Sequence, residues 1–255
     1  MASNLHFLLV MITNETTGTN VNEIATGIYR ISTPVPIPGI PGGFTFNQYL
    51  VVDDESLLFH TGPRSMAPLV AEAVASVVPL ERLNYIALSH HENDEDGGMD
   101  ALLERAPGAV PVCGRLNAML NGELYARPPR ALGDGETLPL GRRIVRWLDA
   151  PHLPHNVECG FLFELYTSTL LCGDLFAQPG ATLPAVNESD DAILGPSEAL
   201  RVAMDPSPGT SNTRAHLERM ASSEPRLLAC MHGSAYRGDG ARMLRALAGN
   251  LGGAP

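Results

Sequence analysis

The sequence contains no lysine: all 17 basic residues are arginine, against 28 aspartates and glutamates. We attribute the missing lysine to codon composition and infer no function from it. The formal net charge is −11, and no stretch of the chain forms a basic stripe. Phosphate backbones require clustered cations, so this charge pattern argues against nucleic acid as a partner.

Paired cysteines and long apolar runs are also missing. The four cysteines lie far apart without a C-x-x-C pair, and Cys172 and Cys230 stand inside apolar runs, as buried free thiols of a reducing compartment do. The apolar run at residues 7–12 has no positive flank and is far too short to span a bilayer. We therefore expect a cytoplasmic protein with no membrane partner.

The composition that remains is that of a globular protein, with 44% hydrophobic and 18% charged residues over 255 positions. This length is ample to bury a core. We expect a loose N-terminal extension over residues 1–22 and a single domain over residues 23–255.

Strand-like segments come first, and strands alternating with helices follow, in two successive sets. The strand-like segments are residues 26–32, 44–52, 57–59, 83–88, 110–113, 144–148, 160–166, 169–172 and 227–231. The helix-like segments are residues 64–78, 98–105, 114–121, 196–204, 211–222 and 239–247. The Pro-rich segments 34–43 and 176–196 are expected as connections. The order favours an α/β fold with two face-to-face sheets and helices outside.

An acidic motif, H-x-E-x-D-E, directly follows the apolar run at residues 83–88. Residues two apart in an extended segment point to the same side, so His90, Glu92 and Asp94 are expected to converge. Unpaired polar groups are costly there, and a metal ion is the usual compensation. The alternative is a solvated acidic loop that caps the next helix.

Three later segments place a metal-capable side chain just after a strand-like run. They are A-P-H-L-P-H with His152 and His155, C-G-D with Asp174, and M-H-G with His232. A lone histidine after a strand is usually a hydrogen-bonded boundary residue. Four such elements in order indicate a single cleft, because strand ends are where a rigid scaffold aims functional groups.

In this order the motifs resemble the metallo-β-lactamase superfamily, over about residues 26–247. Within it they are most similar to the flavodiiron and oxygen-binding di-iron branch. Zinc hydrolases of the superfamily typically carry H-x-H-x-D-H, whereas the di-iron branch has a glutamate where this chain has Glu92. The resemblance implies a four-layer αββα sandwich.

The resemblance also implies a ligand set of two metals bridged by Asp174. His90, Glu92 and His155 would hold the first metal, and Asp94 and His232 the second.

Four assignments leave alternatives open. Where the branch usually has histidine this chain has Glu95, which either replaces that ligand or leaves the second metal under-coordinated. His155 fits the ligand spacing better than His152, which would then lie beside the ligands or in the pocket wall. Tyr236 either donates a hydrogen bond into the cleft, as a catalytic residue would, or is exposed. His60 stands where the superfamily commonly has a ligand-supporting aspartate, and is either such a support or a plain strand-end residue.

Three imidazoles and four carboxylates without a thiolate favour two iron ions, with manganese or zinc as alternatives. We expect a non-haem di-iron protein that binds dioxygen or NO, as an oxygen sensor or a partner-dependent oxidoreductase. Flavodiiron enzymes carry a flavodoxin-like domain and this sequence ends without one, so an external electron donor or signalling partner is expected. Members of this branch often pair head to tail, which predicts a homodimer.

The sequence leaves two other functions open. One is zinc- or manganese-dependent hydrolysis of an ester, lactone or phosphodiester, with Asp94 as proton acceptor. The other is a degenerate fold used only for binding, in which Glu95 marks a lost site.

Overall fold

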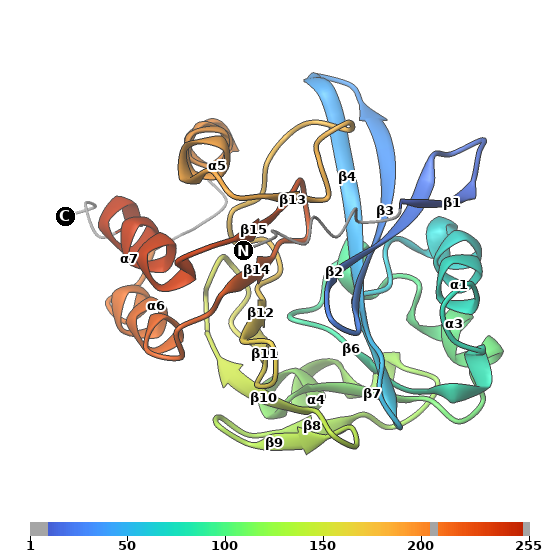
Figure 1. Ribbon diagram of the computed structural model, residues 1–255. Helices are drawn as coiled ribbons and strands as arrows, with labels where there is room; N and C mark the ends of the chain where they lie inside the picture. Colours follow the sequence, from blue (N-terminus) through green and yellow to red (C-terminus); the bar gives the residue numbers. More distant parts are fainter. Residues whose placement is uncertain (1–9, 205–208, 252–255) are drawn as a thin grey trace, which may run out of the picture.

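Two β-sheets face each other in the computed structural model, which describes residues 10–204 and 209–251 (Figure 1). The first sheet runs in chain order: β1 (Met11–Asn14), β2 (Thr19–Ala25), β3 (Ile28–Ile37), β4 (Ile40–Val51), β5 (Ser56–Phe59), β6 (Leu83–Ala87), β7 (Val110–Gly114) and β8 (Arg130–Leu132). The second sheet has the order β13 (Val186–Asn187), β15 (Ala235–Arg237), β14 (Leu227–Ala229), β12 (Thr169–Leu171), β11 (Gly160–Glu164), β10 (Ile144–Asp149) and β9 (Thr137–Pro139).

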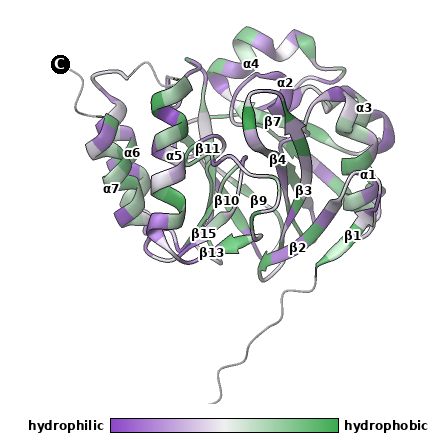
Figure 2. Ribbon diagram, turned by 90° about the horizontal axis from the view of Figure 1, so that it is seen from above, coloured by the Kyte–Doolittle hydropathy of each residue, from purple (hydrophilic) through white to green (hydrophobic). Residues whose placement is uncertain are grey.

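Helices cover the outer faces of both sheets (Figures 1 and 2). The helices are α1 (Ala67–Ala75), α2 (Asn93–Asp96), α3 (Met99–Arg105), α4 (Arg115–Asn121), α5 (Asp190–Met204), α6 (Thr213–Ala221) and α7 (Gly240–Leu251). Val70 of α1 and Leu102 of α3 pack on the first sheet, and Met220 of α6 and Leu244 of α7 pack on the second. None of the helices in the described ranges is long and apolar enough to cross a bilayer.

A third apolar cluster fills the space between the sheets. Phe59 and Tyr49 contribute to it from the first sheet, and Trp147 and Leu162 from the second. The molecule thus has an apolar layer under each helix layer and one between the sheets. The predicted four-layer αββα sandwich is confirmed.

The topology brings the ends of distant strands together at one edge. Strands β5, β6 and β7 pair in parallel in the first sheet, and β12 pairs in parallel with β14 in the second. Parallel neighbours end at the same edge of a sheet. The segments that follow β6, β12 and β14 therefore leave the two sheets close to one another.

The expected loose extension over residues 1–22 is wrong from Met11 onward. Strands β1 and β2 extend the first sheet, and Val21 is buried under α1. Neither strand was predicted, because this Asn- and Thr-rich segment buries only isolated apolar side chains and shows no apolar pattern. Residues 1–9 lie outside the described residues.

Two expected connections also contain regular structure. The segment 34–43 forms the far end of a long hairpin, in which Pro34 of β3 pairs with Thr45 of β4. Helix α5 begins at Asp190 rather than Pro196, so the proline lies inside the helix.

Candidate metal centre

The acidic motif is extended only in its first part. Glu92 has extended backbone angles (φ −149°, ψ 157°) and directly precedes α2, which carries Asp94 and Glu95. The assumption that Asp94 continues an extended run is therefore wrong. The short helix nevertheless turns Asp94 and Glu95 toward the same cluster, whereas Asp96, the third acidic residue of its first turn, bonds His91 and Tyr125.

One group of ligand atoms gathers around His90 and His155. The Nε2 atoms of these two histidines are 3.0 Å apart, and Glu92 Oε2 lies 2.9 Å from His155 Nε2 and 3.4 Å from His90 Nε2. Asp174 Oδ2 lies 3.5 Å from His90 Nε2 and 3.9 Å from His155 Nε2. Four side chains thus aim one ligand atom each at the same point.

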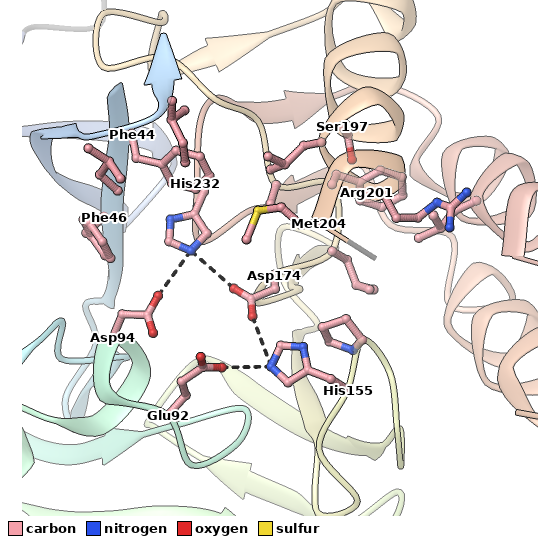
Figure 3. Close-up of a pocket in the computed structure, with 18 of the residues that line it drawn as sticks. Phe44, Phe46, Glu92, Asp94, His155, Asp174, Ser197, Arg201, Met204 and His232 are labelled. Carbon is pink, nitrogen blue, oxygen red and sulfur yellow. Dashed lines mark hydrogen bonds and ion pairs between the residues drawn. The ribbon is translucent and has the colours of Figure 1, made fainter. Parts of the chain in front are cut away.

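A second group gathers around His232. Its Nε2 lies 3.3 Å from Asp94 Oδ2 and 3.5 Å from Asp174 Oδ1. Asp174 therefore directs one carboxylate oxygen at each group, as Figure 3 shows with His232 on one side and His155 on the other. This arrangement suits a carboxylate shared by two cations.

Glycine permits the position of Asp174. Gly173 has a φ of +49°, and a Cβ atom there would meet Ser89 Oγ at 3.1 Å. Any other residue would be strained in this conformation and would push on the segment that carries His90. The G-D motif thus allows the end of β12 to approach the end of β6 closely.

Glu95 provides the test of whether a metal fits. The residue is fully buried, and neither carboxylate oxygen receives a hydrogen bond from an N–H or O–H group of the described residues. Burial, with the charges of Asp174 and Asp94, holds the pKa of Glu95 well above its usual range. Asp174 Oδ1 is also buried without a hydrogen-bond donor. Such orphaned buried acceptors fit cation ligands, because a cation would balance both the charge and the lost hydration.

Hydrogen bonds fix the orientation of two of the histidines. His232 Nδ1 lies 2.9 Å from the Thr45 carbonyl oxygen, to which it must donate, so Nε2 keeps its lone pair for the cluster. His90 Nδ1 lies 2.8 Å from Ser89 Oγ, and Ser89 Oγ lies 2.9 Å from Nε2 of His60. With His90 Nδ1 as donor to Ser89 and Ser89 as donor to His60, Nε2 of His90 is likewise available as a ligand.

The protonation tendencies agree with a strongly anionic cluster. The hydrogen bond that His155 donates to Glu92 raises the pKa of His155. His155, together with His90, holds the pKa of Glu92 well below its usual range. Burial opposes protonation of His232, but Asp94 and Asp174 outweigh it and raise the pKa of this histidine. By contrast, burial lowers the pKa of His60 well below its usual range, which keeps it neutral as an acceptor for Ser89.

Buried polar residues of the first sheet hold the loop that carries His232. Asn47 Nδ2 donates to the carbonyl oxygens of Cys230 (3.0 Å) and Gly233 (2.9 Å), and Arg30 Nη2 donates to the latter at 2.9 Å. The Tyr49 hydroxyl donates to Cys230 O at 2.6 Å. Sequence reasoning missed these residues and Ser89; polar residues inside otherwise apolar strands were the available signal.

Two candidate catalytic residues lie away from the cluster. Tyr236 is buried in the outer core of the second sheet and donates its hydroxyl hydrogen to Asp190 Oδ1 at 2.6 Å, so both alternatives for it, reach into the cleft and exposure, are wrong. His152 does not line the cavity beside the cluster. Its backbone N–H closes a turn onto Asn156 O, and its φ is +61°. Of the two histidines in this loop, the structure brings His155 to the cluster.

The four cysteines are free and buried, as expected for Cys172 and Cys230. His60 contacts His90 of the cluster through Ser89, as a supporting residue would and a plain strand-end residue would not.

Comparison with known families agrees with this geometry. A family model described as "ODP family beta lactamase" matches residues 44–233, which include all seven clustered residues. The chain belongs to this family. The expected membership of the metallo-β-lactamase superfamily is thereby confirmed.

Members of flavodiiron type are among the relatives of this ODP-family chain. Rubredoxin-oxygen oxidoreductase of Megalodesulfovibrio gigas is 28% identical over 143 residues, covering 54% of this chain and 35% of the relative. Nitric oxide reductase of Moorella thermoacetica is 28% identical over 165 residues, covering 62% and 40%. The match thus spans less than half the length of each relative.

Solved structures share the fold over nearly the whole ODP-family chain. The flavodiiron protein of Giardia intestinalis superposes with a TM-score of 0.77 at 19% identity, covering 91% of this chain and 59% of that chain. A fragment of residues 1–254 of a diflavin flavoprotein from Nostoc also gives a TM-score of 0.77, at 20% identity, covering 92% and 96%. At these identities the likeness establishes the fold alone.

Proposed function

We propose that the chain is a non-haem di-iron protein that binds dioxygen or nitric oxide and exchanges electrons with it. The observation that carries the proposal is Asp174, whose two oxygens face two separate groups of ligand atoms. His90, Glu92 and His155 would hold one ion. Asp94, Glu95 and His232 would hold the other, with Asp174 shared.

The donor chemistry supports iron. The seven side chains supply three imidazoles and four carboxylates and no thiolate, a set that suits iron or manganese better than structural zinc. Four carboxylates also neutralise two divalent cations. When bound, a pair of ferrous ions supplies electrons to dioxygen or nitric oxide. The printed names of the two curated relatives, an oxygen oxidoreductase and a nitric oxide reductase, support these two acceptors.

The protein residues would have distinct tasks around such a pair. His232 and His90, oriented through Thr45 and Ser89, present their Nε2 lone pairs without rearrangement. Glu95 would become satisfied only with an ion present. His155 is the most accessible of the three histidines and lines the cavity through which a small molecule reaches the site. We propose that a separate protein donates the electrons or receives the oxygen signal.

Elemental analysis of the protein as isolated, together with its optical spectrum in air, tests this function. We expect about two iron ions per chain and a ferric absorption that appears when the anaerobically reduced protein is mixed with oxygen. Asp174→Asn should lose iron from both groups, whereas Asp191→Asn, an exposed aspartate on α5, should retain it. Zinc in place of iron, with ester or lactone cleavage and no response to oxygen, would contradict the proposal and favour a hydrolase.

A further inference from the structure

The cavity beside the metal cluster is much larger than a diatomic molecule requires. Its volume is about 390 Å³. A water molecule, similar in size to dioxygen, takes about 30 Å³ in the liquid, so the space holds on the order of a dozen non-hydrogen atoms. Cavities of this size are typical of sites for small organic molecules.

The walls of this cavity are apolar and come from four separate parts of the chain. Ile40 lies at the start of β4 near the hairpin tip, Leu175 follows β12, Leu200 belongs to α5 and Leu247 to α7. Phe44 of β4 packs edge-on against the ring of His232, with ring centroids 4.7 Å apart. Apolar side chains thus line the cavity beside the polar cluster, and Figure 3 shows Phe44 and Phe46 on one side of His232 and Met204 on the other.

The charges around the cavity favour an uncharged occupant. Glu92, Asp94 and Asp174 line its base, and a pair of divalent ions would bring the full ligand set close to neutrality. The cationic side chain in the wall, Arg201, is engaged by Glu198, to which its Nε donates at 2.9 Å. The positive charge of Arg201 is thus already paired within the wall, and an anionic group of a bound molecule would gain little binding energy from it.

Helix α5 forms one side of the cavity and is bonded to its neighbours at its start and near its middle, where Asn250 Nδ2 donates to Glu198 Oε2. The Tyr236 hydroxyl and the Arg242 guanidinium both bind the carboxylate of Asp190, the first residue of the helix. Ile193 is the one residue of α5 that is fully buried. Among the later residues of the helix, Ser197, Leu200, Arg201 and Met204 line the cavity.

We propose that this cavity binds an uncharged, mainly hydrocarbon organic molecule next to the metal ligands. Leu200 and Ile40 would form opposite parts of its binding wall. That the bound molecule is a substrate of the metal centre rests on the proposed function. The binding itself is a property of the apolar walls.

Naphthol serves as the uncharged probe and naphthoate as its anionic counterpart, both titrated by calorimetry into the full-length protein with and without iron. Two variants narrow the cavity from different sides, Leu200→Trp and Ile40→Trp. Val202→Trp is the matched control, because Val202 lies two positions further along α5, is 67% exposed and does not line the cavity. Thermal melts establish that each variant is folded.

We expect naphthol to bind the unmodified protein, and each cavity variant to weaken binding roughly tenfold or more. Val202→Trp should leave the affinity unchanged, and naphthoate should bind more weakly than naphthol. No binding, or an equal loss in Val202→Trp, would overturn the proposal, as would naphthoate binding as tightly as naphthol. Iron content measured on the same samples reports separately on the proposed function: naphthol binding to a protein that takes up no iron would refute the di-iron centre and leave the cavity's binding role intact.

Discussion

At the scale of single residues, Glu95 is the side chain least compatible with a metal-free cluster. It is fully buried on a four-residue helix, and its nearest ionisable neighbours include two other carboxylates. A buried acceptor without a donor costs about 1–3 kcal/mol. The same carboxylate stabilises the protein when a cation is present. The contribution of Glu95 to the free energy of unfolding therefore changes sign when metal binds.

This sign change predicts opposite effects of Glu95→Gln in the two states. In the metal-free protein the amide removes the cost of burying a carboxyl group whose pKa is held high, and its N–H donates to neighbouring carboxylates, so the Tm should rise by roughly 3 °C. In the iron-loaded protein the Tm should fall, because a charged ligand is lost. Differential scanning calorimetry of both states checks this, with Glu72→Gln on the exposed face of α1 as the control. A Tm that falls in the metal-free protein would contradict the role given to Glu95.

The hydrogen-bonded chain from His60 through Ser89 to His90 gives a second residue-level prediction. Groups that orient a metal-binding imidazole typically contribute 10–100-fold to metal affinity. Ser89→Ala should therefore weaken iron binding by about tenfold or more, measured by competition with a chromophoric chelator. Ser76→Ala removes a serine hydroxyl bonded to a backbone carbonyl of α1 and should leave the affinity unchanged. An unaltered affinity in Ser89→Ala would show that His90 needs no such orientation.

The clustered residues that belong to one short motif could be predicted from the sequence, whereas contacts between distant segments could not. The spacing of H-x-E-x-D and the G-D and M-H-G motifs are local properties, and the structure brings those residues together. The contact of His60 with Ser89 joins residues 29 apart, and Asn47 reaches Gly233 across 186 positions. Such pairings depend on which strands become neighbours, which no local pattern encodes.

At the scale of elements, the start of α5 depends on a neighbouring strand. Tyr236 of β15 lies four positions after His232, and reach into the cleft was one of the two alternatives for it. In the extended β15 segment its side chain instead points to the outer face, where it binds Asp190. The prediction that α5 begins at Pro196 was also wrong. The helix tolerates the proline in its interior, and acidic residues occupy its first turn.

Tyr236→Phe should therefore affect α5 and leave the metals in place. Loss of one hydrogen bond costs about 1 kcal/mol, and the first turn of α5 should exchange its amide hydrogens faster. Iron content and the oxygen response should be unchanged. Hydrogen exchange with mass spectrometry, beside elemental analysis, measures both effects. Tyr166→Phe, at a largely exposed tyrosine, is the control. A loss of iron in Tyr236→Phe would show that this residue does contribute to the metal site.

At the scale of the whole molecule, the cluster joins the two sheets. Four of the clustered residues, His90, Glu92, Asp94 and Glu95, follow a strand of the first sheet, whereas the other three follow strands of the second. Asn47 and Arg30 already cross between the sheets to hold the His232 loop. The metals would add a second set of cross-links at the same edge, where four carboxylates otherwise repel one another.

Iron loading should consequently stabilise the whole fold. Binding to the folded state alone adds about 3 kcal/mol when the free ion is at about 100 times its Kd, which corresponds to a Tm increase of roughly 6–10 °C. Amides after β6, β12 and β14 should gain protection together, because the ion ties both sheets. Asp174→Asn, which removes the shared ligand, should show a much smaller increase. If iron raised the Tm of this variant as much as that of the unmodified protein, the stabilising ion would lie elsewhere in the molecule, and the assignment of Asp174 as the shared ligand would fail.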